Sequence, residues 1–386
     1  MDIEIISYIY KMDDIYFDKT CVKRRWSQLT GFVRKTLEER DRPRGNAKDI
    51  LLLTHNNPDP DTIAAACGLK TLLMSIGVSS RVAYSGIIGR PENRAMVELL
   101  KLDLSKADKL ARDAYPMAAL IDTQPGTGNN CLPDARIPDI VFDHHIRREV
   151  TKRVPFVEVY TDVGSTSTII THYIMSSGIK LSRKLATALY YGIITDTQDL
   201  GRHSNEADLL AVRFLFPKVL HKTMAKIQKP RIPVSYFREL VTALTMAVIF
   251  DDVVVVDAGR VSTPDTLAQI VDFLIRVEHI KWVLCMGEID GELDFSIRTD
   301  YHGRKAGQVA RCIARELGSA GGHDMTAGGQ IHLAGGDSAN KIKEKLVRRF
   351  LEQLEKDVLQ AESLLSDPFC CMLARTSFKG EDKPLG

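Results

Sequence analysis

The chain has 386 residues, of which 44% are hydrophobic, enough to build two domains with separate cores. Its 52 Lys and Arg residues nearly balance its 50 Asp and Glu residues, and the formal net charge is +2. A protein that follows long duplex nucleic acid usually carries a basic stripe, so this composition argues against such a partner.

Cysteine usage and hydropathy predict a cytoplasmic protein. The seven Cys residues are scattered without Cys-x-x-Cys spacing, which suits reduced thiols better than disulfides or a zinc site. No segment approaches about 20 continuous apolar residues, and Met1–Glu4 lacks the basic-then-apolar layout of a signal peptide. We therefore expect no membrane partner.

The first half of the chain predicts an α/β domain behind a short extension. Residues 1–47 are expected to form a helical extension and linker, with a helix near Trp26 to Glu39. Over residues 48–225, apolar runs alternate with helical stretches, which predicts a doubly wound, mostly parallel sheet. The expected strands include 50–53, 118–121 and 140–142, and helices are expected near 63–76, 165–176 and 181–190.

The second half predicts a smaller, mixed α/β domain. Two prolines within Gln228–Pro233 interrupt any helix, so residues 226–245 are the expected linker. The domain at 246–345 begins with two apolar runs, 247–250 and 253–256, and helices are expected near 264–277 and 304–317. Residues 346–386 complete a charged amphipathic helix, from about Asn340 to Leu365, and a tail.

Acidic and imidazole side chains directly follow several apolar runs of the first domain. Parallel strands bring their carboxyl ends to one edge of a sheet, so we expect these side chains to converge. Each alone would be an ordinary cap or turn residue. Together the carboxylates would repel one another unless divalent cations neutralised them. The residues concerned are His55, Asp59 and Asp61 after 50–53, Asp122 after 118–121, Asp143, His144 and His145 after 140–142, and Asp196 after the apolar run 190–195.

Such a cluster predicts a site for two divalent ions. A pair of ions about 3.5–4 Å apart binds phosphate oxygens, activates water and stabilises the leaving oxygen of a displacement. Ser165 and Thr166 resemble a nearby helix start, whose terminus can cradle phosphate, although a plain cap is the simpler interpretation.

At these residues the chain resembles the DHH phosphoesterase superfamily. The similarity is to its two-domain branch, which includes oligoribonucleases and 3′-phosphoadenosine-5′-phosphate phosphatases. The name-giving triplet stands at Asp143–His145, and the first motif, His-x-x-x-Asp-x-Asp, stands at His55–Asp61. Residues Ser319–Gly329 look like the Gly-Gly-Gly-His motif of the associated substrate-binding domain, so the resemblance covers roughly 48–345.

The resemblance implies a role for each residue of the cluster. His55 and Asp59 would hold one metal ion, while Asp61, His144 and Asp196 would hold the other, with Asp122 bridging them. His145 would lie near the substrate phosphate, and Asp143 would support the cluster, so Asp122, Asp143 and His145 form the catalytic group. The family generally works with Mn²⁺, two ions per site, and Mg²⁺ or Co²⁺ stay open by ligand type.

The second domain would hold the substrate. Arg298, at the end of the strand-like segment Asp294–Arg298, matches the family's phosphate-gripping arginine, and a guanidinium suits a terminal phosphate. Gly321 and Gly322 would let the main chain approach a nucleotide, and His323 could stack on a base or bond a phosphate. Seen alone, a Gly-rich turn with one His is more often structural.

These features predict a metal-dependent phosphoesterase of the 3′-5′ exoribonuclease or nucleotide phosphatase type. Its substrate would be a short single-stranded oligoribonucleotide, 3′-phosphoadenosine-5′-phosphate or both, clamped between the domains and hydrolysed by two-metal activation of water. An inorganic pyrophosphatase or exopolyphosphatase-like hydrolase is one alternative, and a non-catalytic nucleotide-sensing protein of the same fold is another. A homodimer is left open.

Overall fold

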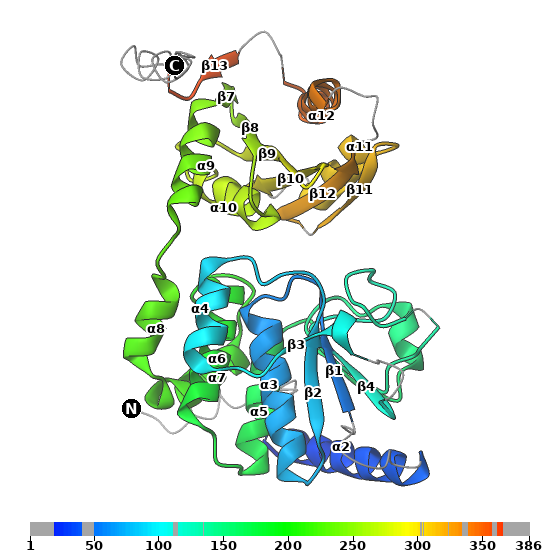
Figure 1. The fold of residues 1–386 in the computed structure, drawn as a ribbon. Coiled ribbons are helices and arrows are strands. Elements are labelled where there is room, and N and C mark those ends of the chain that lie inside the picture. The colour runs from blue at the N-terminus through cyan, green and yellow to red at the C-terminus, as the bar shows by residue number, and fades with distance from the viewer. Residues whose placement is uncertain are drawn as a thin grey trace, which may run out of the picture. The chain divides into compact units, whose positions relative to one another are not determined.

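The computed structural model describes residues 19–40, 50–110, 115–133, 135–301, 303, 305–322, 324–333, 339–356 and 361–365. The chain divides into two compact units, residues 1–230 and residues 231–386 (Figure 1). His323 and the expected tail lie outside the described residues.

The first unit is built on a six-stranded sheet in which every neighbouring pair of strands is parallel. The strand order is β3-β2-β1-β4-β5-β6, and the three central strands are completely buried, which explains their nearly continuous apolar sequences. The parallel α/β sheet predicted from the sequence is confirmed. The strands are β1 (Ile50–Thr54), β2 (Ser80–Tyr84), β3 (Ser105–Lys106), β4 (Met117–Ile121), β5 (Ile140–Asp143) and β6 (Phe156–Val159).

Helices pack on one face of this sheet. Alternate strand residues such as Leu52 and Phe142 join the helices in one apolar core, while Leu51 and Val141 face a second cluster formed with connecting segments. The helices are α2 (Lys19–Glu39), α3 (Pro60–Ser75), α4 (Pro91–Leu100), α5 (Thr166–Ser177), α6 (Arg183–Asp196), α7 (Glu206–Leu215) and α8 (His221–Gln228), with short 3₁₀ turns at Ala107–Lys109, Glu149–Arg153 and Phe216–Lys218.

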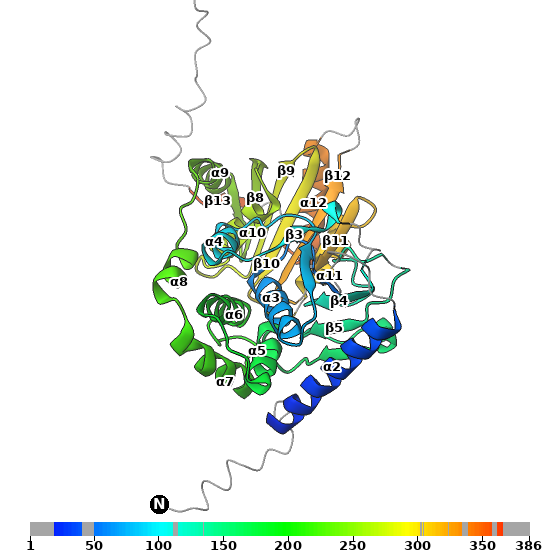
Figure 2. The ribbon, with the colours of Figure 1, turned by 60° about the horizontal axis from the view of Figure 1, so that its bottom comes forward.

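Helix α2 belongs to the core of the first unit. Its apolar residues, among them Leu29 and Val33, are buried there, and the helix lies beside α5 (Figure 2). Arg25 reaches the edge strand β6, where its Nε donates to Glu158 at 2.6 Å and its Nη2 donates to the Val157 carbonyl at 2.9 Å. The helix therefore covers a strand edge that would otherwise expose backbone groups.

The second unit contains a mixed seven-stranded sheet with the order β11-β12-β10-β9-β8-β7-β13. Strands β8 and β9 are parallel, and the other neighbours are antiparallel, as expected for a mixed α/β domain. One core lies under α11 and α12, and the other lies under α9 and α10. The elements are α9 (Val234–Thr245), β7 (Ala247–Phe250), β8 (Val253–Arg260), α10 (Pro264–Leu274), β9 (Trp282–Ile289), β10 (Glu292–Thr299), α11 (Ala306–Ala314), β11 (Gly318–Gly322), β12 (Thr326–His332), α12 (Ala339–Gln353) and β13 (Ala361–Ser363).

Two segments differ from the sequence-based expectation or refine it. The helix expected from about Asn340 to Leu365 is too long: α12 ends at Gln353, and Ala361–Ser363 instead pairs with β7 as an edge strand. Within the expected linker at 226–245, α8 ends at Gln228 and α9 begins at Val234. Among the described helices, none is both long enough and apolar enough to cross a bilayer.

Replacement of Arg25 by Ala should destabilise the first unit by about 1.5–3 kcal/mol, because it removes a charge-assisted hydrogen bond from the buried Glu158 carboxylate. Each unit contains one Trp, so fluorescence of Trp26 in a Trp282→Phe background would report unfolding of the first unit in urea. Lys23→Ala, on the exposed side of the same helix, should change stability by less than about 0.5 kcal/mol. Equal effects of the two substitutions would contradict this account.

Candidate metal centre

Three adjacent strands deliver polar side chains to one edge of the first sheet. Strand β1 leads into His55, β4 leads into Asp122, and β5 ends at Asp143, just before His144 and His145. The strands are in parallel register, with Thr54 beside Ile121 and Ile121 beside Phe142, so their carboxyl ends are level. The convergence expected for these strand ends is therefore present.

Asp122 turns sharply out of its strand. Its backbone has φ of 59°, which is uncommon for a residue other than glycine, while its N–H still donates to the Phe142 carbonyl at 2.8 Å. Thr166 Oγ1 donates to Asp122 Oδ1 at 2.9 Å. Strained backbone of this kind persists where the surrounding structure holds it, and here it points the carboxylate into the cluster.

Two acidic residues near the start of helix α3 have roles as caps and as members of the cluster. Asp59 is the N-cap of α3 and accepts a hydrogen bond from the Thr62 N–H at 3.0 Å. Asp61 accepts from the N–H groups of Thr166 and Ser167 at 2.8 and 2.7 Å, so its carboxylate neutralises the first turn of helix α5. Because these amides already donate to Asp61, they are not available to bind a phosphate, as was considered for the helix start at Ser165 and Thr166.

Asp196 reaches the cluster from a helix. The apolar run 190–195 was expected to precede it as a strand-like segment, and this expectation is wrong, because the run is the last part of α6. Ser182 caps that helix, and one side of it is buried, so the run is apolar for helix packing rather than for a sheet. Gly192 permits the close approach of α6 to α3: a Cβ there would lie 3.0 Å from Asp61 Cα.

The six predicted metal ligands fall into two neighbouring groups, and Asp122 of the first group lies beside His144 of the second. His55 Nε2 lies 3.7 Å from Asp59 Oδ1 and 3.5 Å from Asp122 Oδ2. On the other side, His144 Nε2 lies 3.6 Å from Asp122 Oδ1 and 3.1 Å from Asp196 Oδ2. In each of the sets His55/Asp59/Asp122 and Asp61/His144/Asp196, the potential ligand atoms lie within 4.8 Å of one another.

The histidine rings are oriented by their Nδ1 atoms. Nδ1 of His55 lies 2.9 Å from the Asn56 carbonyl, and Nδ1 of His144 lies 3.3 Å from the Val163 carbonyl. A carbonyl only accepts, so Nδ1 carries the proton in both rings and Nε2 is the atom presented to the cluster. This arrangement is typical of metal-binding histidines, whose second nitrogen is fixed by a neighbouring acceptor.

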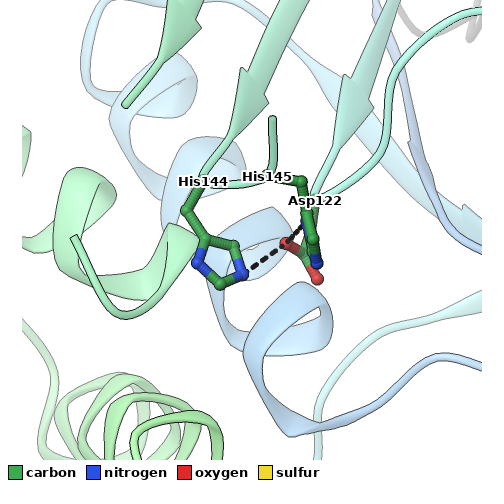
Figure 3. A group of neighbouring side chains, drawn as sticks. All are labelled: Asp122, His144 and His145. Carbon is green, nitrogen blue, oxygen red and sulfur yellow. Dashed lines mark ion pairs between the residues drawn. The ribbon is translucent and has the colours of Figure 1, made fainter. Parts of the chain in front are cut away.

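His145 is held by a carboxylate instead. Its Nδ1 lies 2.8 Å from Asp143 Oδ1, and the ring also approaches Asp122, as Figure 3 shows for Asp122, His144 and His145. Burial favours the neutral ring, but the hydrogen bond and charge of Asp143 raise the pKa of His145. The Asp143 carboxylate, itself buried, has a pKa lowered chiefly by His145.

The ionisable groups of the cluster strongly shift one another's pKa values. Burial and the nearby charge of Asp196 raise the pKa of Asp61 to about 7, and burial together with Asp61 raises the pKa of Asp122 well above its ordinary value. Burial opposes protonation of His55 and His144, yet neighbouring carboxylates raise the pKa of each to about 10. Carboxylates are driven towards protonation and imidazoles towards positive charge, as expected where positive charge is required.

Two buried atoms are suited to binding a cation. His144 Nε2 and Asp196 Oδ2 face each other, but neither has hydrogen-bond geometry with any described residue. Buried polar atoms without such partners are rare in proteins and indicate a water or an ion. Carboxylate oxygens mixed with imidazole nitrogens suit divalent ions such as Mn²⁺, so the donor set fits the predicted group.

Two buried supporting residues were not predicted from the sequence. Gln124 bonds to Asp143, and Asp208 accepts hydrogen bonds from Gly164 N–H and Thr168 Oγ1 just where helix α5 begins. Gln124 stands two residues after Asp122 in the Asp-Thr-Gln segment, which was the one available signal. Asp208 gave no such signal, because a capping box at Asn205 explains its type equally well.

The predicted substrate-binding residues lie in the second unit. Arg298 is on β10 and its Nε lies 2.5 Å from Asp272 Oδ1. Gly321 and Gly322 are in strand β11 rather than in the expected turn. Gly322 has φ of 150°, and a Cβ there would lie 2.3 Å from the Thr326 carbonyl oxygen, so this position requires glycine. His323 lies outside the described residues.

Binding of divalent metal to the metal-free protein should release protons near pH 7, because the ring nitrogens of His55 and His144 must be deprotonated to act as ligands. Calorimetric titration with Mn²⁺ in buffers of different ionisation enthalpy would count the protons. Affinity should rise with pH, since fewer protons then compete.

His55→Gln should reduce the number of protons released. His172→Gln is the matched control, because His172 is also a buried imidazole but bonds to the Ala207 carbonyl away from the cluster. An observed heat that does not depend on the buffer would contradict proton release.

Comparisons with known proteins match both halves of the chain to domains of one family. The DHH family, N-terminal domain, matches residues 49–193, and the DHHA1 domain matches residues 251–356. An uncharacterized protein of Methanocaldococcus jannaschii is 33% identical over 329 residues, which are 85% of this chain and 66% of that protein. The chain thus spans about two thirds of that relative's length.

Two further similarities bear on function and fold. The bifunctional oligoribonuclease and PAP phosphatase NrnA of Bacillus subtilis is 26% identical over 323 residues, covering 76% of this chain and 92% of that protein. A crystal structure of an exopolyphosphatase-related protein from Bacteroides fragilis has a TM-score of 0.65 at 14% identity, covering 85% of this chain and 96% of that one, and it supports the fold. The two domain matches, in this order and on these two units, show that the chain belongs to the DHH phosphoesterase family.

Proposed function

We propose that this protein is a Mn²⁺-dependent phosphoesterase that hydrolyses phosphate esters of short oligoribonucleotides, of 3′-phosphoadenosine-5′-phosphate, or of both. The observation that carries the proposal is the pair of adjacent ligand groups, His55/Asp59/Asp122 and Asp61/His144/Asp196, joined where Asp122 lies beside His144. A relative that spans most of this chain, NrnA of Bacillus subtilis, is named for both of these activities.

The ligand geometry supports a division of labour among the six residues. His55 and Asp59 would hold one ion, and Asp61, His144 and Asp196 would hold the other. Asp122 would be shared, since its Oδ2 faces His55 and its Oδ1 faces His144. When bound, such a pair of ions supplies Lewis-acid charge that lowers the pKa of water and neutralises phosphate.

His145 and Asp143 would complete the reaction chemistry. Asp143 fixes the His145 ring through Nδ1, which leaves Nε2 as the nitrogen that we assign to a phosphate or leaving-group oxygen. The His145 ring is 40% exposed, whereas Asp143 is only 1% exposed, so the imidazole is accessible to substrate and the carboxylate is not. Asp143 acts on the reaction through His145.

A short nucleotide is the substrate that the composition supports. The net charge of +2 provides little general attraction for a long polyanion. Arg298, Gly321, Gly322 and His323 are proposed to bind it, with Arg298 exchanging its contact with Asp272 for a substrate phosphate.

The purified protein with Mn²⁺ should hydrolyse a 5′-phosphorylated diribonucleotide or 3′-phosphoadenosine-5′-phosphate faster than inorganic pyrophosphate. Product formation from each substrate, measured separately, tests this order. Preference for pyrophosphate would favour the pyrophosphatase alternative. Tight nucleotide binding without turnover of any substrate would favour a sensor.

Asp122→Ala should lower the turnover rate by more than about 100-fold, beyond the range typical of residues that only support metal ligands. Asp139→Asn is the matched control: Asp139 is equally buried at the opposite end of β5, where it accepts a hydrogen bond from Ala118 N–H. Its replacement should preserve the rate. Comparable activity of the two variants would rule out the proposed role of Asp122.

A further inference from the structure

One buried amide connects the His145 side of the cluster to the loop that follows it. Gln124 is 1% exposed and lies two residues after Asp122. Its Nε2 donates to Asp143 Oδ2 at 2.6 Å and to the Ile146 carbonyl at 3.2 Å. Its Oε1 accepts from Arg148 N–H at 2.8 Å and from Thr151 Oγ1 at 2.7 Å.

The two ends of this amide have different partners, and each is matched in polarity. The Nε2 end donates only, which suits the Asp143 carboxylate, while the Oε1 end accepts only, which suits an N–H and a hydroxyl. No other uncharged side chain of the same length supplies a donor at one end and an acceptor at the other. Burial makes any mismatch costly, since an unsatisfied polar group cannot turn to water.

Because Gln124 fixes one oxygen of Asp143, it also affects the position of the His145 ring, which bonds to the other oxygen. The oxygen that Gln124 does not use, Oδ1, lies 2.8 Å from His145 Nδ1 and also accepts from the N–H of His144 at 2.9 Å. The carboxylate is thus held at both oxygens. Rotation of Asp143 would break its contact with His145 Nδ1, and the bond from Gln124 opposes that rotation together with the backbone amides of His144 and His145.

The loop held by the other end presents side chains beside the centre. Ile146 directly follows His145 and is 84% exposed, and Arg147 is exposed next to it. Their backbone is anchored by Gln124 at Ile146 and at Arg148.

We propose that Gln124 is a positioning residue whose amide locks the Asp143–His145 pair to the loop 146–151 and so aligns His145 with the substrate phosphate. This inference rests on the proposed function for its kinetic consequence, but its structural consequence is independent of turnover. Gln124 contacts none of the six proposed metal ligands through its side chain in the hydrogen bonds described for it.

A charge swap tests the matched polarity. In Asp143→Asn, an amide NH₂ would face the NH₂ of Gln124, so the pair becomes mismatched. Adding Gln124→Glu places an acceptor opposite the new amide NH₂ at position 143 and keeps an oxygen for Arg148 N–H and Thr151 Oγ1, while the bond to the Ile146 carbonyl is lost. We expect the double variant to have a higher kcat than Asp143→Asn by about tenfold, which corresponds to one hydrogen bond to a charged group.

Two single variants separate positioning from simple stability. Gln124→Met preserves the side-chain volume but removes both the Nε2 donor and the Oε1 acceptor of the amide. It should lower kcat by about 10- to 100-fold while the Mn²⁺ content stays unchanged. Thr151→Val removes only the hydroxyl at the Oε1 end. It should lower the free energy of unfolding and speed hydrogen exchange in peptides covering 146–151, with kcat close to that of the unmodified protein.

A readout without turnover keeps the two proposals distinguishable. The readout is the NMR resonance of the His145 Nδ1 proton in metal-free protein labelled with ¹⁵N-histidine, and this resonance is assigned by its loss in His145→Gln. It should shift in Gln124→Met. In the Gln124→Glu/Asp143→Asn double variant, it should lie closer to its original position than it does in Asp143→Asn. If the unmodified protein lacks turnover but these shifts occur, the proposed function fails and the positioning role stands.

Unchanged kcat in Gln124→Met would overturn the inference, as would a double variant no better than Asp143→Asn in both kcat and the His145 resonance. Equal kcat losses in Gln124→Met and Thr151→Val would also overturn it, because they would mean that general loop packing, not the Asp143 contact, controls the rate.

Discussion

Crowding of carboxylates at one sheet edge is the constraint on which the rest of this structure depends. Asp59 and Asp61, Asp122, and Asp196 come from three separate segments, yet they are brought close enough to perturb one another. Buried like charges are unfavourable unless cations or hydrogen bonds offset them. Helix α5 offsets part of this cost through the amides that bind Asp61, and the remaining donor atoms are arranged to accept divalent ions.

The structure around the cluster is rigid and holds the crowded carboxylates in place. The central strands are buried on both faces, glycine at 192 lets α6 bring Asp196 close, and Asp208 anchors the start of α5. On the other side, Gln124 ties the Asp143–His145 pair to its loop. Metal ligands and the groups that orient them thus lie together at the carboxyl end of the sheet.

Much of this arrangement could be predicted from the sequence, for identifiable reasons. Strands β1, β4 and β5 are buried, so their apolar runs are nearly unbroken and the polar residues after them stand out. The prediction for the run 190–195 before Asp196 was wrong, because a short, mostly apolar run fits a strand and a buried helix segment equally well. The pairing of Arg25 with Glu158 spans 133 residues and leaves no local pattern, and Gln124 resembles any polar residue after a strand.

The most direct test of the account is to locate the ions. Crystals grown with Mn²⁺ and measured at the manganese absorption edge should show two anomalous peaks about 3.5–4 Å apart, one beside His55 and Asp59 and one beside His144 and Asp196, with Asp122 between them. A single peak, or peaks away from Asp122, would contradict the binuclear centre.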